Sequence, residues 1–287
     1  MKPPILIIYH ADCVDGFTAA WVLARHFGLD ETSLFPAKYH EPPPPVERVA
    51  GRQVYVVDFC YPYEVMKGLS FVSGKTPVLL DHHKTSAEIA SRLFDAGHAL
   101  GTHDLKHSGA RLAWDWTGRV RDRPQLIDYV EDRDLWHNTL SDSENVALAI
   151  QGYPMWLETW DRLAATPISE LAEAGEAIRN WQIERLFKPL LASAGTVVLD
   201  GVMLHAVNAP PWQASDLLSR LLEARSNDTH AAAAFWYDVD SRLWHVSLRS
   251  DATRPDVSEL ARQNGGGGHR NAAGFTSRTF PFGGCVV

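Results

Sequence analysis

Short apolar runs alternate with amphipathic segments in the first half of the chain, which predicts a parallel sheet with helices on both faces. Apolar runs at residues 4–9, 54–57 and 76–80 predict strands. Residues 17–27 have the small and apolar side chains of a packed helix, and Gly28 is a helix-ending signal. Strand, polar loop and helix in this order predict a doubly wound, mostly parallel α/β domain.

The pattern that follows, up to about residue 191, is mainly helical. Four consecutive prolines predict that residues 34–46 form an extended surface connection, because proline fits neither a helix interior nor a central strand. Polar residues predict a loop at residues 97–109. Helices are expected at residues 62–69, 86–94, 108–114, 126–136, 146–151, 155–165 and 169–191.

The last third of the chain predicts a second, smaller α/β domain. Asp200-Gly201 is a strong hairpin signal between two apolar strands. Further strands are expected at residues 231–237 and 243–249, with helices at residues 215–224 and 257–263. We therefore predict a first domain at residues 1–170, a connecting helix at 171–195, a second domain at 196–287, and a cleft between the two domains.

A polar cluster, Asp81-His82-His83-Lys84, directly follows the third predicted strand. Open α/β sheets bind their ligands at the carboxyl ends of strands. Asp58 ends the preceding strand, and Asp15 lies in the loop after the first one. Three acids at one sheet edge repel one another strongly unless cations lie between them. The sequence therefore predicts divalent metal ions at this edge.

Three other features leave alternatives open. In the first loop, His10, Asp12 and Asp15 can converge on a metal ion, or one of the acids can cap the helix that follows. The helix after Ser108 can direct its N-terminus to an anion or can be an ordinary packed helix, which is the interpretation we favour. The acids of residues 131–134 can supply a fourth metal-binding carboxylate or form a solvated turn.

A glycine-rich stretch, residues 264–275, predicts a phosphate-binding element. Its four consecutive glycines present bare backbone N–H groups, and His269 and Arg270 add positively charged donors. A flexible linker is the alternative interpretation. Structured flanking segments and the following Asn-Ala-Ala-Gly favour tight packing over a linker.

Composition narrows the class of protein. The 287 residues are 45% hydrophobic and 22% charged, with a net charge of −8 and a pI near 5.9. This acidic balance argues against a protein that grips duplex DNA through its phosphates. No apolar run is long enough to span a membrane. Three cysteines without a CxxC pair predict a reducing, cytoplasmic location.

Two of these motifs resemble a known family. Asp81-His82-His83 after an apolar strand is similar to the signature of the DHH phosphoesterase superfamily. The glycine-rich stretch from Gly265 to Phe275 resembles the motif of its C-terminal DHH-associated domain. The superfamily includes nanoRNases that also hydrolyse 3′-phosphoadenosine 5′-phosphate, RecJ-type exonucleases, cyclic-di-AMP phosphodiesterases, family II pyrophosphatases and prune-like polyphosphatases.

The resemblance implies a catalytic domain holding two divalent ions, manganese with magnesium or cobalt as alternatives, and a substrate-binding second domain. Asp58, His82 and His83 would be catalytic, with Asp58 shared between the ions. Cys13 stands where the family commonly has an acid. The implied metal ligands are His10, Asp12, Asp15, Asp58, His82 and either Asp132 or Asp134. The implied substrate-binding residues are His83, Lys84, Arg249, Gly266, Gly267, Gly268, His269 and Arg270.

The function expected from these features is metal-dependent hydrolysis of phosphodiester or phosphomonoester bonds in small nucleotides or short single-stranded oligonucleotides. Duplex DNA and membranes are not expected partners, and a homo-oligomer is compatible with the sequence. A pyrophosphatase or polyphosphatase is one alternative, although the glycine motif is not the C-terminal signature of the pyrophosphatase branch. A non-catalytic nucleotide sensor, disabled at the first motif, is the other.

Overall fold

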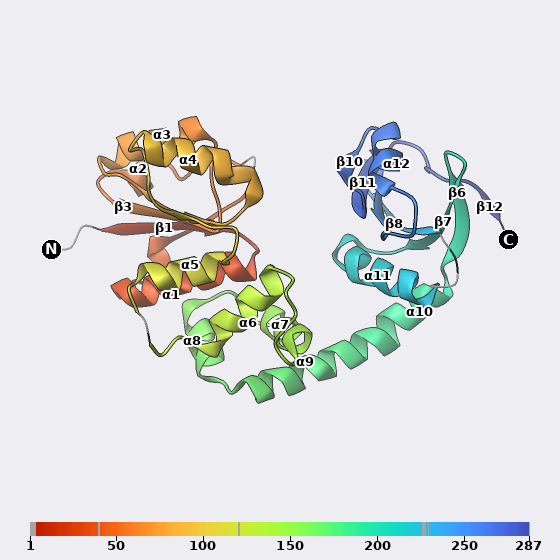
Figure 1. Cartoon of the computed structure of the whole chain (residues 1–287), viewed down its shortest axis with the longest axis horizontal. Coiled ribbons are helices and arrows are strands. Elements are labelled where there is room, and N and C mark those ends of the chain that lie inside the picture. Colours follow the sequence, from red (N-terminus) through yellow and green to blue (C-terminus); the bar gives the residue numbers. More distant parts are fainter. Residues whose placement is uncertain (1–3, 40, 120, 226–227, 229, 287) are drawn as a thin grey trace. The chain divides into compact units, whose positions relative to one another are not determined.

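The computed structural model describes residues 4–39, 41–119, 121–225, 228 and 230–286, without the side chains of residues 284–286. The chain divides into two compact units, Met1–Arg179 and Asn180–Val287. Helix α9 (Ile168–Gln182) contains the boundary. Figure 1 shows the helices and strands of each unit, and the two units are described one at a time below.

The N-terminal unit contains a five-stranded sheet in the order β2-β1-β3-β4-β5. All four strand pairings are parallel, as the apolar runs predict. The strands are β1 (Ile5–His10), β2 (Leu34–Ala37), β3 (Gln53–Val57), β4 (Val78–Asp81) and β5 (Leu100–His103). β2 is added on one side of β1, and β3, β4 and β5 are added on the other side. Such sheets bind their ligands at this switch point, between β1 and β3.

Helices cover both faces of this sheet, so the predicted doubly wound architecture is confirmed (Figure 1). The central strands are buried on both sides and are therefore almost entirely apolar. One face packs against α1 (Val14–Phe27) and α5 (Gly109–Trp116). The other packs against α2 (Val46–Val49), α3 (Tyr63–Ser73) and α4 (Ala87–Asp95).

Helices α6 (Gln125–Asp134), α7 (Ser143–Gln151) and α8 (Leu157–Ala165) extend the core beyond α1. Trp160 is fully buried, with its ring centroid 4.7 Å from that of Phe17. Its indole N–H donates to the hydroxyl of Thr18 at 2.8 Å. These contacts fix α1, and with it the loop that α1 follows, against the helical layer.

Three local predictions were wrong. Leu34–Ala37 is strand β2, which tolerates Pro36 because it lies at the sheet edge. Leu100–His103 is strand β5, the opposite edge strand, whose Leu-Gly-Thr-His sequence is partly exposed and does not show a buried-strand pattern. Helix α1 begins at Val14, so Asp15 lies in its first turn and not in the preceding loop.

The C-terminal unit contains a mixed seven-stranded sheet in the order β10-β11-β9-β8-β7-β6-β12. The hairpin predicted at Asp200-Gly201 is present, and both residues have the positive φ of a primed turn, 49° and 82°. The strands of this seven-stranded sheet are β6 (Gly195–Leu199), β7 (Val202–Asn208), β8 (Ala231–Asp238), β9 (Leu243–Arg249), β10 (Gly267–His269), β11 (Ala272–Ser277) and β12 (Gly283–Val286). Helices α10 (Lys188–Ala192) and α11 (Ala214–Ala224) cover one face, and α12 (Val257–Gln263) covers the other.

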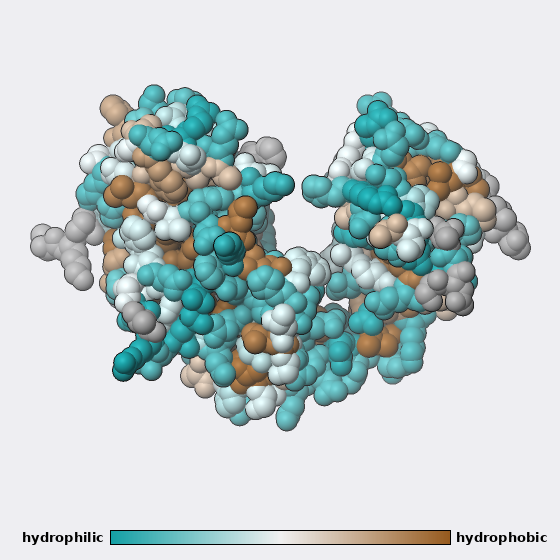
Figure 2. Space-filling view, viewed as in Figure 1, coloured by the Kyte–Doolittle hydropathy of each residue, from teal (hydrophilic) through white to brown (hydrophobic). Residues whose placement is uncertain are grey.

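The visible surfaces of both units are mixed. Figure 2 shows hydrophobic residues in small patches among hydrophilic ones. Phe71, Trp136 and Trp212 are among the large side chains that remain well exposed. In the part of the chain that the structure describes, none of the helices combines the length and the apolar character needed to cross a membrane.

Candidate metal centre

Polar side chains from five elements meet at the carboxyl edge of the N-terminal sheet. His10 is the last residue of β1, Asp58 directly follows β3, and His82 directly follows β4. Asp15 comes from the first turn of α1, and Asp134 is the last residue of α6. The strand order β1-β3-β4 makes the first three of these positions neighbours, as the sequence predicts.

Asp58 lies at the centre of this cluster. Its backbone has a positive φ of 53°, an uncommon conformation for a residue other than glycine, and its side chain is only 1% exposed. One carboxylate oxygen, Oδ1, lies 3.0 Å from Nε2 of His82. The other, Oδ2, lies 3.5 Å from Nδ1 of His10. Neither Oδ2 nor that Nδ1 has a hydrogen-bond partner among the described residues, although both atoms are buried.

Two glycines allow the backbone to approach Asp58 this closely. A Cβ on Gly109 would lie 2.6 Å from Cβ of Asp58 and 2.8 Å from Oδ2 of Asp15. A Cβ on Gly16 would lie 2.6 Å from the carbonyl oxygen of His10. Real carbon atoms do not approach so closely, so the cluster requires glycine at both positions.

Asp15 accepts hydrogen bonds from the first backbone N–H groups of α5. Its carboxylate lies 2.6 Å from the nitrogen of Gly109 and 3.0 Å from that of Ala110. Ser108 is the N-cap of the same helix, as expected. The anion at this helix N-terminus is thus a side chain of the protein, and Asp15 caps α5 and not its own helix.

His82 carries the positive charge among three carboxylates. Its Nε2 lies 3.0 Å from Asp58, 3.4 Å from Asp134 and 3.7 Å from Asp15. Burial acts to lower the pKa of His82, but the hydrogen bond and the charges of these acids raise it to about 9. Burial and the Asp58 charge raise the pKa values of Asp15 and Asp134. Acids whose pKa values are raised by burial and by one another's charge are suited to bind a divalent cation, which neutralises that charge.

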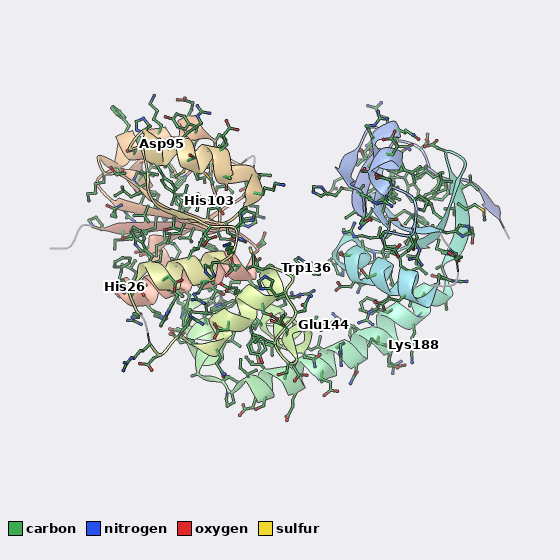
Figure 3. All side chains as sticks on the ribbon, in the orientation of Figure 1. His26, Asp95, His103, Trp136, Glu144 and Lys188 are labelled. Carbon is green, nitrogen blue, oxygen red and sulfur yellow. The ribbon has the colours of Figure 1, made fainter. Side chains whose placement is uncertain are left out.

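His83 is held by Asp81, which does not face the cluster. Asp81 is fully buried, and its carboxylate accepts hydrogen bonds from Nδ1 of His83 at 2.8 Å and from the hydroxyl of Ser86. The expectation that Asp81 adds to the repulsion at the sheet edge was therefore wrong, because local donors satisfy its charge. Asp134 takes that place beside Asp15 and Asp58. His103, labelled in Figure 3, contacts the carbonyl oxygen of His83 at 3.0 Å and lies outside the cluster.

The donor atoms of the cluster form overlapping groups that can each hold a metal ion. One group is His10, Cys13 and Asp58, and another is Asp15, His82 and Asp134, with all ligand atoms of a group within 4.8 Å of one another. His82 and His83 also form such a group with Asp58. Imidazole and carboxylate donors with unpartnered buried atoms fit borderline divalent cations.

The structure does not bring two predicted ligands into these groups. Asp12 is 79% exposed and pairs with Lys38 at 2.7 Å. Asp132 is buried, but its carboxylate accepts hydrogen bonds from the backbone nitrogen and hydroxyl of Thr139 and from the nitrogen of Leu140. Of the two acids that the sequence left open, Asp134 faces the cluster and Asp132 holds the loop after α6.

A pocket of about 650 Å³ opens beside the cluster within the N-terminal unit. His10, Asp15 and Asp134 form its polar end. Apolar side chains from α6, α7 and the segment before α8 form the rest, including Tyr129, Val130, Ile150 and Met155. Trp136, labelled in Figure 3, lies just past α6 at the rim, with the guanidinium of Arg133 4.5 Å from its ring centroid.

The predicted substrate-binding residues lie in several places. In the N-terminal unit, Lys84 is exposed in the turn after His83. In the C-terminal unit, Gly267 and Gly268 form edge strand β10 with His269, and that imidazole is exposed. The half-buried guanidinium of Arg249 contacts the hydroxyl of Ser215 at 3.4 Å.

A second pocket, of about 450 Å³, lies next to the glycine stretch in the C-terminal unit. Gly266, Gly274 and Ser247 line it, together with a stacked pair of rings, Trp236 and His245. Arg270 has a different role, because its guanidinium donates to the backbone carbonyls of residues 252 and 254.

Comparisons with known proteins bear on the fold. No family model matches the chain. The chain is 25% identical over 289 residues to the uncharacterized protein R106 of Acanthamoeba polyphaga mimivirus, covering 94% of this chain. It spans 66% of the length of that relative.

Two solved structures resemble the fold of this chain over most of its length. The pGpG-specific phosphodiesterase PggH of Vibrio cholerae superposes with a TM-score of 0.57 at 13% identity, covering 94% of this chain and 92% of that one. RecJ of Thermus thermophilus in complex with Mn²⁺ superposes with a TM-score of 0.50 at 19% identity, covering 94% of this chain and 49% of that one. The chain therefore shares its two-domain α/β fold with these two proteins.

Some features of the site were not predicted from the sequence. The apolar pocket carries no linear motif, because its residues come from separate helices and fill ordinary core positions of each. Gly109 gave no signal either, since only the approach of Asp58 in space requires a glycine there. Cys13 did carry a signal, because it lies between His10 and Asp15 in the sequence. In the structure its sulfur lies in one donor group with His10 and Asp58.

Proposed function

We propose that the protein is a metal-dependent phosphoesterase that hydrolyses phosphodiester or phosphomonoester bonds of small nucleotides or short single-stranded oligonucleotides. The observation that carries this proposal is the position of Asp58, whose two carboxylate oxygens face two different donor groups. That arrangement suits a carboxylate shared by two cations. The DHH fold, which the chain has in common with a phosphodiesterase, supports the same reaction class.

We assign one ion to His10 and Asp58, and a second to Asp15, His82 and Asp134, with Asp58 also able to reach the second ion through the oxygen that lies 3.0 Å from His82. Manganese suits the second group, which offers only imidazole and carboxylate donors. When bound, such a pair of ions supplies an activated water and neutralises charge on the phosphoryl oxygens.

The protein's own groups position the substrate. Asp81 uses Nδ1 of His83, so Nε2 is the atom left to donate a hydrogen bond to a phosphoryl oxygen. Asp15 is held rigidly by its two hydrogen bonds to α5. His83 therefore acts as a catalytic group, and the fixed carboxylate keeps the cluster from rearranging as the substrate enters.

The pocket of about 650 Å³ is the proposed site for a nucleoside part of the substrate. Its apolar wall suits a planar base, and its polar end lies at His10, Asp15 and Asp134. Pyrophosphate offers nothing to this wall, so nucleotide substrates are favoured over a pyrophosphatase activity.

The C-terminal unit is proposed to bind substrate phosphate through exposed donors. These are the exposed imidazole of His269 and the backbone of Gly267–Gly268, together with the half-buried guanidinium of Arg249; the N–H of Gly266 already donates to the carbonyl oxygen of Ala261. Lys84 of the N-terminal unit is proposed to add a positive charge near the cluster. We also propose a cytoplasmic location, because Cys13 and Cys60 are free thiols.

A substrate screen tests the proposal. The full chain is stripped with a chelator, reloaded with manganese, and assayed on linear dinucleotides, 3′-phosphoadenosine 5′-phosphate, cyclic dinucleotides and pyrophosphate. We expect hydrolysis of a nucleotide substrate that chelation abolishes. Asp58→Ala and His82→Ala should lose turnover, His269→Ala should mainly raise KM, and Asp12→Ala should stay active as the matched control.

Three results would contradict the proposal. Full activity after chelation would rule out the metal mechanism. Hydrolysis of pyrophosphate alone would favour the pyrophosphatase alternative. Nucleotide binding with no bound metal and no turnover would identify a sensor.

A further inference from the structure

Cys13 occupies a helix-capping position without capping the helix. It directly precedes α1 with extended backbone angles of −118° and 127°, and its side chain makes no capping hydrogen bond to the described backbone of α1. Serine, threonine, aspartate and asparagine are the usual residues at such a position, because their oxygens accept backbone N–H bonds. The sulfur of Cys13 is therefore not a regular N-cap, and it lies close to the backbone of Gly16 and the carboxylate of Asp58.

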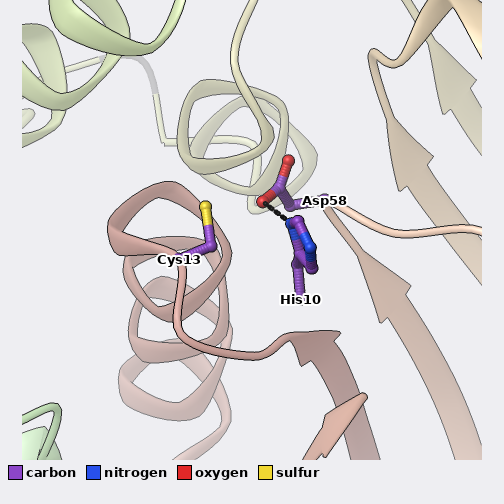
Figure 4. A group of neighbouring side chains, drawn as sticks. All are labelled: His10, Cys13 and Asp58. Atoms are coloured by element: carbon purple, nitrogen blue, oxygen red, sulfur yellow. Dashed lines mark ion pairs between the residues drawn. The ribbon is translucent and has the colours of Figure 1, made fainter. Parts of the chain in front are cut away.

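The side chain of Cys13 instead belongs to a donor group with His10 and Asp58. The sulfur, an imidazole nitrogen and a carboxylate oxygen lie within 4.8 Å of one another. The three side chains come from the start of α1, the end of β1 and the residue after β3 (Figure 4). The connection between β1 and α1 and the distant end of β3 thus bring three ligand types to one place.

A second observation points to a ligand at this place. The side chain of Asp58 is 1% exposed, and its Oδ2, on the His10 side, has no hydrogen-bond partner among the residues that the structure describes. The buried Nδ1 of His10 is also unpartnered there. Buried polar atoms almost always have a hydrogen-bond partner, and these two meet only as a long ion pair at 3.5 Å (Figure 4), so a cation beside them would satisfy both.

We propose that Cys13 is a metal ligand, and that His10, Cys13 and Asp58 hold an ion of the zinc, cobalt(II) or iron(II) class instead of manganese. This inference rests on the metal site of the proposed function and deepens it. Thiolate sulfur selects softer ions, whereas the group of Asp15, His82 and Asp134 contains only nitrogen and oxygen donors. The two positions therefore hold different metals.

Binding at this position exchanges a proton for the ion. The sulfur of Cys13 donates an electron pair to the metal, and its thiol proton leaves to solvent, so no oxidant or reductant is involved. Three protein ligands leave coordination positions open for water or substrate, as in catalytic zinc sites.

Cobalt spectroscopy tests the proposal without measuring hydrolysis. The full-length protein is stripped of metal, loaded with Co²⁺ and examined for a near-ultraviolet thiolate-to-cobalt charge-transfer band. We expect the band in the wild type. Cys60→Ser is the matched control and should keep the band, because the buried sulfur of Cys60 contacts the carbonyl oxygen of Tyr61 at 3.3 Å and is not in the donor group. Cys13→Ser should lose the band and keep the weaker ligand-field absorption of bound cobalt.

Metal competition gives a second readout. With zinc and manganese both present, the wild type should retain one zinc per chain by elemental analysis. Cys13→Ser should weaken zinc binding by at least about 10-fold, and Cys13→Asp should shift this position towards manganese. In the wild type, bound zinc should also protect Cys13 from alkylation by iodoacetamide, a measurement that does not depend on how a variant folds.

The possible failures are distinguishable. Two bound ions with no charge-transfer band, or a band that persists in Cys13→Ser, would overturn the Cys13 ligand and leave the phosphoesterase proposal standing. Zinc that leaves the alkylation of Cys13 unchanged would do the same. A protein that binds no cobalt, zinc or manganese would contradict both proposals.

Discussion

Asp132 and Asp134 give the sharpest test of the metal centre, because two acids on one helix have opposite roles. Asp134 lies 3.4 Å from His82 in the cluster. Asp132 is buried and accepts three hydrogen bonds from Thr139 and Leu140. Replacing Asp134 with alanine should abolish manganese binding at the group of Asp15, His82 and Asp134, at little cost in stability. Replacing Asp132 with alanine should cost stability and leave metal affinity nearly unchanged.

The magnitudes follow from these contacts. Each hydrogen bond to Asp132 contributes roughly 1 kcal/mol, so Asp132→Ala should lower the free energy of unfolding by about 3 kcal/mol. For a unit of 179 residues this corresponds to a fall in Tm of roughly 6–12 °C. Metal at 100 times its Kd adds about 2.7 kcal/mol, or roughly 5–11 °C, to any protein that still binds it.

Scanning calorimetry of each variant, with chelator and with manganese, measures both quantities. Wild type and Asp132→Ala should show the metal-induced rise in Tm, and Asp134→Ala should not. Asp12→Ala is the matched control, because Asp12 is exposed and pairs only with Lys38 among the described residues. A normal metal-induced rise in Asp134→Ala, or a lost rise in Asp132→Ala without a lower metal-free Tm, would refute the assignment of the two acids.

Three further predictions concern other parts of the N-terminal unit. Gly109→Ala should impair metal binding because its Cβ would meet Asp58, whereas Gly68→Ala in α3, with open space around it, should be neutral or stabilising in a thermal melt. Burial acts to raise the pKa of Asp161, but hydrogen bonds from Arg25 and Trp21 lower it, so this carboxylate stabilises the fold above its unfolded pKa of about 3.9 and less at lower pH. The Tm difference between wild type and Asp161→Asn should therefore be full above about pH 5 and shrink as the pH falls below about 4. Chelation should lower the Tm of the N-terminal unit, and manganese should restore it in a calorimetric titration.

The central strands and their terminal ligands were predictable because both follow from local patterns. A buried parallel strand must be apolar throughout, and a polar residue at its end marks the binding edge. The edge strands β2 and β5 were not predictable in this way. Only one of their sides pairs with a neighbour, so proline and exposed polar residues are tolerated there.

The choice between Asp132 and Asp134 shows what a single sequence lacks. Successive helical residues turn by about 100°, so two acids separated by one residue point in nearly opposite directions. Only one of them can face the sheet edge. Which one does depends on how α6 packs against its neighbours, and that packing is set by apolar contacts distant from the acids. The link between Asp15 and α5 was hidden for the same reason, because 94 residues separate Asp15 from Gly109.

The hydrogen bonds from α5 to Asp15 have a consequence for the order of events after synthesis. The N-terminus of a helix carries about half a positive charge, and here it lies against a buried acid of the cluster. This partial charge, together with the protonated His82, offsets the repulsion among the carboxylates before any ion arrives. We therefore expect the N-terminal unit to fold without bound metal and to load its ions afterwards.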